Sequence, residues 1–207
     1  MPTATTRRDE IRRSRAEIRD RMISATRELL RTRAFAELTV DDVMRPTGQG
    51  RTVFYRHFDD LGDLLARASG EAIERLYDAQ AELAQPSAAD SATAVREALT
   101  EAVAVFREHG PLLRALVEAS AADGRLATAV EALRRRFDDL TARALGDMAA
   151  PGEPRLADVG ETARALTLMN EGYLLDAFGR EPRIPADTAV ATLVDVWEAV
   201  VQRSAAD

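Results

Sequence analysis

TVDDVMRPTGQGRTVFYRHF, residues 39–58, decides the fold of this chain. Its beginning predicts a short capped helix, because Thr39 can accept from a free amide of the first turn and Asp42 stands three residues later. Gly48 predicts a tight turn out of that helix. The spacing of residues 51–58 predicts a second helix of about two turns with both phenylalanines on one face. Two short helices joined by a glycine turn are typical of the helix-turn-helix, whose second helix enters the DNA major groove.

The segment resembles the DNA-binding signature of the tetracycline-repressor (TetR) family. The residues that carry the resemblance are the capped start, the turn glycine and the aromatic-basic ending: Thr39, Val40, Asp42, Val43, Gly48, Phe54, Tyr55, His57 and Phe58. As in that family, the signature lies near the N-terminus of a chain of about 200 residues. The resemblance implies a helix-turn-helix DNA-binding domain at residues 1–60. It further implies an effector-binding and dimerisation domain at residues 61–207.

The whole sequence carries only helical signals, and the predicted fold class is all-α with about nine helices. Besides the motif, apolar periodicity and breakers predict helices over residues 10–33, 61–84, 91–109, 111–121, 126–149, 156–178 and 186–204. Gly110-Pro111 is expected to separate two of them, and further breaks are expected at residues 85–87 and 151–154. No apolar run approaches the roughly 20 residues of a membrane span. The polar, arginine-rich N-terminus is unlike a secretory signal, so a cytoplasmic protein is expected.

The composition argues against an enzyme. There is no Cys, and the two histidines, His57 and His109, lie too far apart in sequence to predict a metal site. We find no glycine-rich phosphate loop and no Ser-His-Asp candidate. The sequence therefore predicts no catalytic site, no metal and no cofactor.

The charge is divided unevenly along the chain. Residues 1–60 hold 13 Arg and 10 acidic residues, whereas the remainder holds 15 Arg and 25 acidic residues. A basic head on an acidic body suits a nucleic-acid partner despite the net charge of −7. The densest cluster can be a solvated, frayed arm or an arm that contacts phosphates, and its members are Arg7, Arg8, Arg12, Arg13, Arg15, Arg19 and Arg21.

The resemblance implies a double-stranded palindromic operator as the partner of a homodimer, with DNA contacts from the two motif helices. The predicted contact residues are Thr39, Gln49, Gly50, Arg51, Thr52, Tyr55 and His57. The fork of Arg51 matches guanine O6 and N7. Tyr55, Thr39 and His57 are expected to contact phosphates. The alternatives are a core aromatic for Tyr55 and an ordinary surface residue for His57.

The chain departs from the family pattern at several positions. Gln49 stands where a β-branched residue is common, and Val53 stands where Thr is common. Pro46 is expected to shorten or kink the first motif helix. Leu61 replaces a phosphate-gripping Lys within an acidic run at residues 59–63. These departures keep open a second hypothesis, a protein-interaction module whose head has lost DNA binding.

The closing part of the body resembles the ethionamide-repressor branch of the family, from Leu166-Thr-Leu-Met-Asn-Glu through Phe178-Gly-Arg-Glu-Pro to Trp197. The resemblance implies a small lipophilic effector that releases a repressor from DNA. Predicted ligand-binding residues are Phe106, Phe137, Leu140, Thr141, Met169, Asn170, Tyr173 and Trp197. Asn170 is the most informative, being an amide on an otherwise apolar face. Each of these residues can alternatively belong to the core.

The last two predicted helices carry apolar stripes that suit a four-helix dimer interface. The residues assigned to that interface are Leu166, Leu174, Val190, Leu193, Val194 and Val201. The alternative is that the stripes form the core of the monomer.

Overall fold

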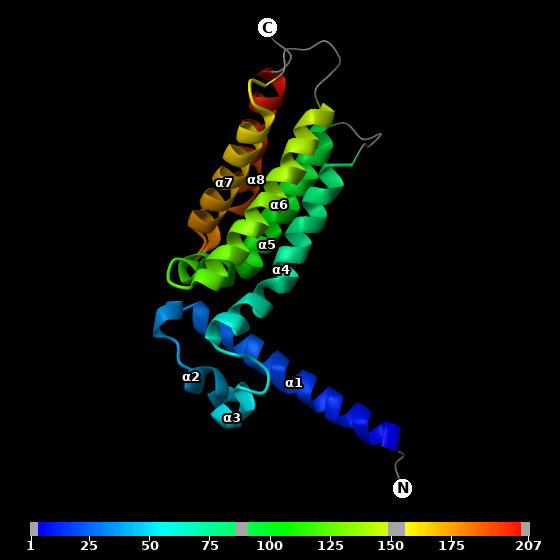
Figure 1. The fold of residues 1–207 in the computed structure, drawn as a ribbon. Coiled ribbons are helices and arrows are strands. Elements are labelled where there is room, and N and C mark those ends of the chain that lie inside the picture. The colour runs from blue at the N-terminus through cyan, green and yellow to red at the C-terminus, as the bar shows by residue number, and fades with distance from the viewer. Residues whose placement is uncertain (1–3, 86–90, 149–155, 204–207) are drawn as a thin grey trace. The chain divides into compact units, whose positions relative to one another are not determined.

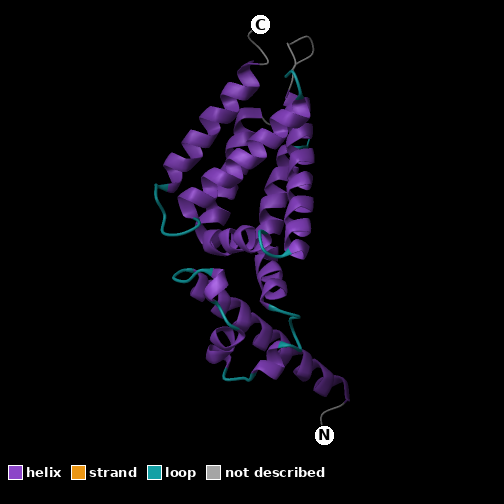
Figure 2. Cartoon of the chain, turned by 60° about the vertical axis from the view of Figure 1, so that its left-hand side comes forward, coloured by secondary structure: helices purple, strands orange, loops and turns teal. Residues whose placement is uncertain are grey.

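The computed structural model describes residues 4–85, 91–148 and 156–203, and these ranges contain helices and loops without strands (Figures 1 and 2). The α-helices are α1 (Ala4–Leu30), α2 (Val40–Met44), α3 (Arg51–Phe54), α4 (Leu61–Leu83), α5 (Ser91–Ser120), α6 (Gly124–Met148), α7 (Val159–Phe178) and α8 (Ala186–Arg203), and two 3-10 helices, η1 (Phe35–Glu37) and η2 (Arg45–Thr47), lie in between. The all-α prediction is confirmed. Of the break predicted at residues 85–87, Gln85 follows the end of α4 at Leu83, whereas residues 86–87 lie outside the described residues, as does the break predicted at 151–154.

The chain forms two compact units, Met1–Ala68 and Ser69–Asp207. The division falls inside α4, whereas the sequence predicts a boundary between residues 60 and 61, before that helix. The first unit contains α1 to α3 and the start of α4. The second contains the rest of α4 and the helices α5 to α8.

The first unit encloses a small core in which α1, α2, α3 and the start of α4 meet. Its buried members are Met22, Val43, Met44, Phe54, Phe58 and Leu64. Leu61 and Val53, two of the departures from the family pattern, are half-buried and pack against this core. Leu61 thus contributes packing at the start of α4. Leu38 is also buried, and Phe35 is half-buried.

The second unit is a helical bundle in which α5, α6, α7 and α8 run side by side (Figure 1). Its core includes Trp197, Phe178, Leu174 and Leu193, each at most 2% exposed. No helix in the described part of the chain is long and apolar enough to cross a membrane.

The prediction that Gly110-Pro111 ends a helix is wrong, because α5 continues through both residues to Ser120. Pro111 lacks the amide that would bond within the helix, which ordinarily costs about 3 kcal/mol. The segment that follows nevertheless buries Leu112 and Leu113, so packing holds it in the helix. Gly110 serves a different purpose from termination, since its Cα faces the Phe178 carbonyl at the end of α7.

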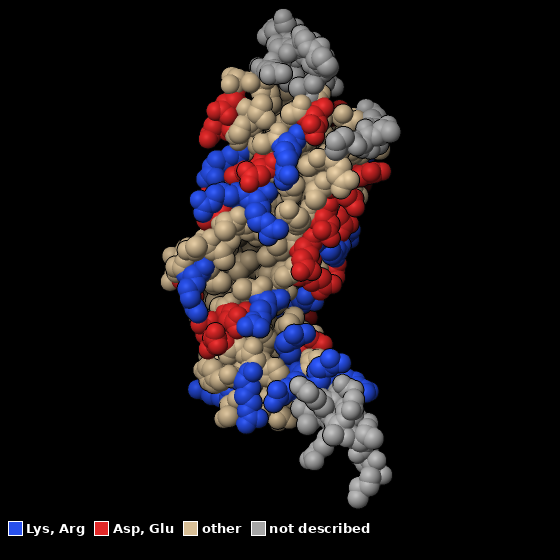
Figure 3. All heavy atoms as spheres, turned by 45° about the vertical axis from the view of Figure 1, so that its right-hand side comes forward, with Lys and Arg blue, Asp and Glu red and all other residues tan. Residues whose placement is uncertain are grey.

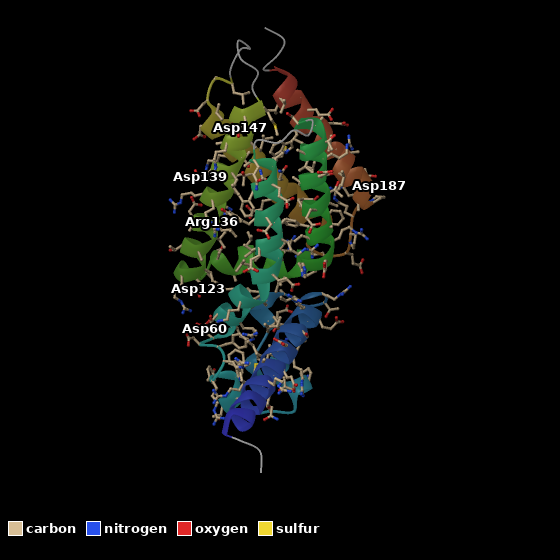
Figure 4. All side chains as sticks on the ribbon, turned by 90° about the vertical axis from the view of Figure 1, so that its right-hand side faces the viewer. Asp60, Asp123, Arg136, Asp139, Asp147 and Asp187 are labelled. Atoms are coloured by element: carbon tan, nitrogen blue, oxygen red, sulfur yellow. The ribbon has the colours of Figure 1, made fainter. Side chains whose placement is uncertain are left out.

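Aspartates cap three of the long helices. Asp60 and Asp123, both labelled in Figure 4, accept hydrogen bonds from the amides of Asp63 (2.8 Å) and Arg125 (2.8 Å). Asp158 accepts from Glu161 at 3.0 Å at the start of α7. Acidic caps satisfy free amides and suit the positive end of the helix dipole, which explains where these helices begin.

Candidate functional site

The turn between α2 and α3 is built by Thr47 and Gly48. Among the described residues only Gly48 has a positive φ, at 67°, and its amide donates to the Arg45 carbonyl at 3.3 Å. The buried Thr47 hydroxyl donates to the Met44 carbonyl at 2.7 Å and accepts from the Gln49 amide at 3.2 Å. These bonds satisfy polar groups in the turn and fix the direction of α3.

The predicted cap of α2 is confirmed. The Asp42 amide donates to the Thr39 hydroxyl at 3.2 Å, and the Thr39 amide donates to Asp42 Oδ2 at 3.0 Å. These bonds to Thr39, with help from Arg33, lower the pKa of Asp42 from 3.8 to about 2. The ionised Asp42 carboxylate therefore stabilises the fold at pH values above its ordinary pKa of 3.8. This contribution is lost as the pH falls towards 2.

The rest of the cap segment bears on two predictions. The Thr39 hydroxyl donates to Asp42 Oδ2 at 2.6 Å, so a phosphate contact from Thr39 would have to replace this bond. Pro46 lies in η2, and α2 ends two residues before it, in agreement with the expected shortening.

The second motif helix is shorter than predicted, since regular helix extends from Arg51 only to Phe54. Helical hydrogen bonding continues once more, from the Phe58 amide to the Phe54 carbonyl at 3.0 Å. This last turn divides the aromatic cluster. Phe54 and Phe58 are buried, whereas Tyr55 is 59% exposed, which argues against its alternative interpretation as a core aromatic.

The surface around α3 carries most of the predicted DNA contacts. The exposed members are Gln49, Gly50, Arg51, Thr52 and Tyr55. On the face drawn in Figure 3 the charged side chains of the first unit are mainly basic. The side chains of residues 4–11 lie outside the described part, so the phosphate-contacting arm with Arg7 and Arg8 stays a prediction.

The guanidinium of Arg51 is paired with Asp41 of α2. Its Nε donates to Asp41 Oδ1 at 2.5 Å and its Nη2 donates to Asp41 Oδ2. The hydrogen bonds from Arg51 lower the pKa of the Asp41 carboxyl and Asp41 raises the pKa of the guanidinium, so both groups are charged at neutral pH. Sequence reasoning missed this partner, because no spacing rule links residues on opposite sides of a turn.

His57 is half-buried beside a group of arginines. Burial lowers its pKa, and the positive charges of Arg15, Arg19 and Arg56 lower it further. The ring is therefore neutral at neutral pH and can donate one N–H. A phosphate placed among these groups would be attracted by the three guanidinium groups.

The acidic start of α4 is engaged in local contacts. Asp63 Oδ2 accepts from the Asp59 amide at 3.1 Å, and Asp63 Oδ1 accepts from Arg67 Nε at 2.8 Å. Asp60 caps the helix. The acidic run thus stabilises the start of α4, and Arg67 offsets part of its negative charge.

A cavity of about 130 Å³ lies inside the second unit, between α4, α5, α6 and α7. Its wall is mainly apolar, with Ile73, Leu76, Ala98, Ala102, Phe106, Leu113, Leu116, Val130, Leu133, Phe137 and Leu174. Polar side chains occur among them: Gln80, Arg134, Thr141, Thr167, Asn170 and Glu171. The described residues contain no cluster of three potential metal ligands.

The polar part of the wall is held together by hydrogen bonds. Arg134 and Glu171 form a bidentate ion pair with both N–O distances at 2.7 Å, and their side chains are 27% and 21% exposed. Gln80 Nε2 donates to the Thr141 hydroxyl at 3.0 Å. These side chains come from α4, α6 and α7, so the cavity combines apolar surface with polar groups that are already oriented.

The structure brings some of the predicted ligand residues to the cavity and leaves others elsewhere. Phe106, Phe137, Thr141 and Asn170 line it. Leu140 and Trp197 are buried in the core, and Met169 and Tyr173 are half-buried against it. Trp197 contacts a cavity residue without lining the cavity, because its Nε1 donates to Asn170 Oδ1 at 3.4 Å. This bond uses the Asn170 oxygen and does not involve the Asn170 NH₂ group.

The predicted dimer residues are placed mainly inside the protomer. Leu166, Leu174, Leu193 and Val194 are at most 4% exposed, while Val190 and Val201 are half-buried against the core. The assignment of the four buried residues to a dimer surface is therefore corrected: packing inside the unit already covers them. The large exposed apolar side chains on α7 and α8 are instead Leu168 (43%) and Val196 (36%).

Sequence comparison assigns both units to known families. Residues 22–68 match the family of bacterial regulatory proteins, tetR family, and residues 95–202 match the C-terminal domain of the transcriptional regulator EthR. The chain is 29% identical over 183 residues to the HTH-type transcriptional regulator EthR of Mycobacterium tuberculosis, covering 86% of this chain and 85% of that protein. EthR of Mycolicibacterium smegmatis is 27% identical over 178 residues, covering 85% and 82% of the two chains.

Solved structures share the same fold. The TetR family transcriptional regulator PfmR from Thermus thermophilus superposes with a TM-score of 0.71 at 19% identity, covering 85% of this chain and 96% of that one. These proteins and families are transcriptional regulators and not enzymes, in agreement with the missing catalytic constellation. From its helix-turn-helix unit and its EthR-type C-terminal domain, the chain belongs to the TetR family of bacterial transcriptional regulators.

Proposed function

We propose that this regulator is a repressor that binds a palindromic operator as a homodimer and is released by a small amphipathic molecule. One observation carries the DNA-binding part: the last turn of the motif buries Phe54 and Phe58 while it exposes Tyr55 and keeps Arg51 on the surface. The buried phenylalanines anchor the helix to the core of the first unit, and the exposed polar side chains are free to contact DNA. The bacterial cytoplasm, which contains the chromosome, is the expected location.

Dimerisation follows from how little DNA one recognition helix can contact. A single such helix meets a few base pairs, whereas a two-fold dimer places two helices about one turn of DNA apart, roughly 34–36 Å. The exposed faces of α7 and α8 suit such contact. Leu168 is flanked on its face by the exposed small residues Ala165 and Gly172, and Val196 is followed by exposed Ala199. Small neighbours let two helices approach closely, so we place the dimer surface here.

Arg51→Ala and Tyr55→Phe are each expected to weaken operator binding without changing the fold. Losing the Arg51 fork removes about 1–3 kcal/mol of base discrimination. Losing the Tyr55 hydroxyl removes a hydrogen bond to a charged phosphate, worth about 1.5–3 kcal/mol. Fluorescence anisotropy at one fixed salt concentration measures both losses, with circular dichroism as the check on folding. An operator affinity equal to that of the unmodified protein in either variant would refute that residue's assignment.

The effector we propose has an apolar body and one hydrogen-bonding head. A cavity of about 130 Å³ is close to the roughly 150 Å³ that holds benzene in an engineered apolar cavity, so it suits a ligand body of about that size. The head would meet the Asn170 amide or the Arg134–Glu171 pair. Release requires that the ligand favour a protein conformation with lower operator affinity.

Ala102→Phe is expected to fill the cavity and abolish the response to the effector. Ala102 lines the cavity and is half-buried, so a benzyl group there occupies the space of the ligand. A thermal-shift screen of compounds with aryl or alkyl bodies and an amide or carboxylate head identifies a stabilising compound in the unmodified protein; at 100 times its Kd it should add about 2.7 kcal/mol. The shift should vanish in Ala102→Phe and persist in Ala132→Phe, a control on the exposed surface of α6. An equal shift in Ala102→Phe would place the ligand elsewhere.

The second hypothesis is an interaction module without DNA binding. Leu61 in place of a basic residue and the acidic start of α4 favour it. The contacts of Asp60 and Asp63 weaken that argument, because these carboxylates serve the helix start and Arg67. Recovery of DNA from a random pool distinguishes the two hypotheses.

A further inference from the structure

We propose that Asp41 determines the base specificity of the operator contact by holding the Arg51 guanidinium with its outer edge turned towards a guanine. This inference rests on the proposed DNA-binding function. Asp41 lies within the motif but is not among the residues that carry the family resemblance, and no sequence pattern marks it as a site residue.

The geometry of the pair leaves the useful edge of the guanidinium unoccupied by Asp41. Asp41 accepts from Nε and Nη2, which lie along one side of the planar group. Two N–H groups on Nη1 and one on Nη2 remain beyond that side. An Nη1–Nη2 edge presents two parallel donors, and this arrangement matches guanine O6 and N7. One arginine can thus hold a carboxylate and a guanine at the same time.

The position of the pair argues that its role is specificity rather than stability. Arg51 and Asp41 are 62% and 57% exposed, and an ion pair in that setting adds little to folding stability. The pair nevertheless joins the first turn of α2 to the first turn of α3 across the Gly48 turn. It restricts a long flexible side chain at the helix end that meets base edges, and a restricted side chain loses less freedom on binding.

The opposite role, masking, gives the opposite prediction. If Asp41 only occupied Arg51 and kept it from DNA, removing the carboxylate would release Arg51 and strengthen its contact with the guanine. If Asp41 positions Arg51, removing it lets the side chain sample other rotamers. Affinity for all DNA would then rise slightly through the loss of one negative charge, while discrimination between bases falls.

The experiment compares Asp41→Asn with the unmodified protein on two duplexes. One is the operator recovered by selection, and the other carries a substitution of the guanine pair whose preference is lost in Arg51→Ala. The unmodified protein should prefer the first duplex by on the order of tenfold or more. In Asp41→Asn the preference should shrink to about threefold or less, with affinity for the substituted duplex unchanged or higher.

Two controls separate position from charge. Glu37→Gln removes one exposed negative charge from the same unit without touching Arg51, and it should keep the full preference. Asp41→Glu keeps the carboxylate and should retain part of the preference for the first duplex. An unchanged or larger preference in Asp41→Asn would overturn the positioning role. Failure of the unmodified protein to prefer any duplex would instead overturn the proposed function, and the two failures are thereby distinguished.

Discussion

Gly110→Ala is expected to destabilise the second unit by about 3 kcal/mol, the upper part of the range for over-packed sites. A Cβ at this position would lie 2.1 Å from the Phe178 carbonyl oxygen and 2.7 Å from its carbon. Both atoms belong to the backbone at the end of α7, so no side-chain rotation relieves the clash. One of the two helices would have to move, and each is packed into the core of the unit.

Gly146→Ala is the matched control. Gly146 is also a helical glycine, but it is exposed on α6 and a Cβ there would meet nothing within 4 Å. Alanine should therefore leave stability unchanged or raise it by up to about 1 kcal/mol through helix propensity. Thermal or urea unfolding followed by circular dichroism measures both variants. If Gly110→Ala unfolded at the same temperature or urea concentration as Gly146→Ala, α5 and α7 would not approach each other this closely.

Leu168→Glu is expected to convert the proposed dimer into a folded monomer and to remove most operator affinity. Among the described residues only three large hydrophobic side chains are exposed, and two of them, Leu168 and Val196, lie on α7 and α8. Burying an unpaired carboxylate in an interface costs several kcal/mol, and a two-fold axis would place two of them there. A monomer contacts one half-site, so the second recognition helix no longer contributes.

Light scattering coupled to size-exclusion chromatography gives the oligomeric state, and anisotropy gives the operator affinity. Val196→Glu should behave like Leu168→Glu, whereas Ala132→Glu, on the exposed surface of α6, should stay dimeric. A Leu168→Glu protein that remains a dimer with full affinity would place the interface on another surface.

The local features of the motif could be predicted from sequence because they depend on neighbours in the chain. The Thr39–Asp42 cap and the left-handed Gly48 both follow from residues within one or two turns. The prediction of a helix end at Gly110-Pro111 was wrong because the role of Gly110 depends on a residue distant in the chain. The glycine is explained by the close approach of Phe178, 68 positions away, which no local rule contains.

The candidate sites show the same limit. The resemblance to the ethionamide-repressor branch predicts Asn170 and Phe106 as ligand-binding residues, and both side chains line the cavity. Arg134 and Glu171 were missed, since each alone is typical of a solvated helix face and only their pairing across α6 and α7 brings them inward.

Periodicity alone was a poor guide to the dimer surface, because four of the residues it assigned there are buried within the unit. α7 has apolar residues on more than one face, so the sequence could not distinguish buried Leu166 from exposed Leu168.

Selection of bound DNA from a pool of random duplexes tests the central claim most directly. The full-length protein is incubated with the pool at low salt, bound duplexes are recovered and sequenced, and Arg51→Ala is processed in parallel. The account predicts an enriched palindrome whose half-sites lie about one helical turn apart, with one guanine position losing its preference in Arg51→Ala. Recovery of no enriched sequence from the folded protein would contradict it and favour the interaction module.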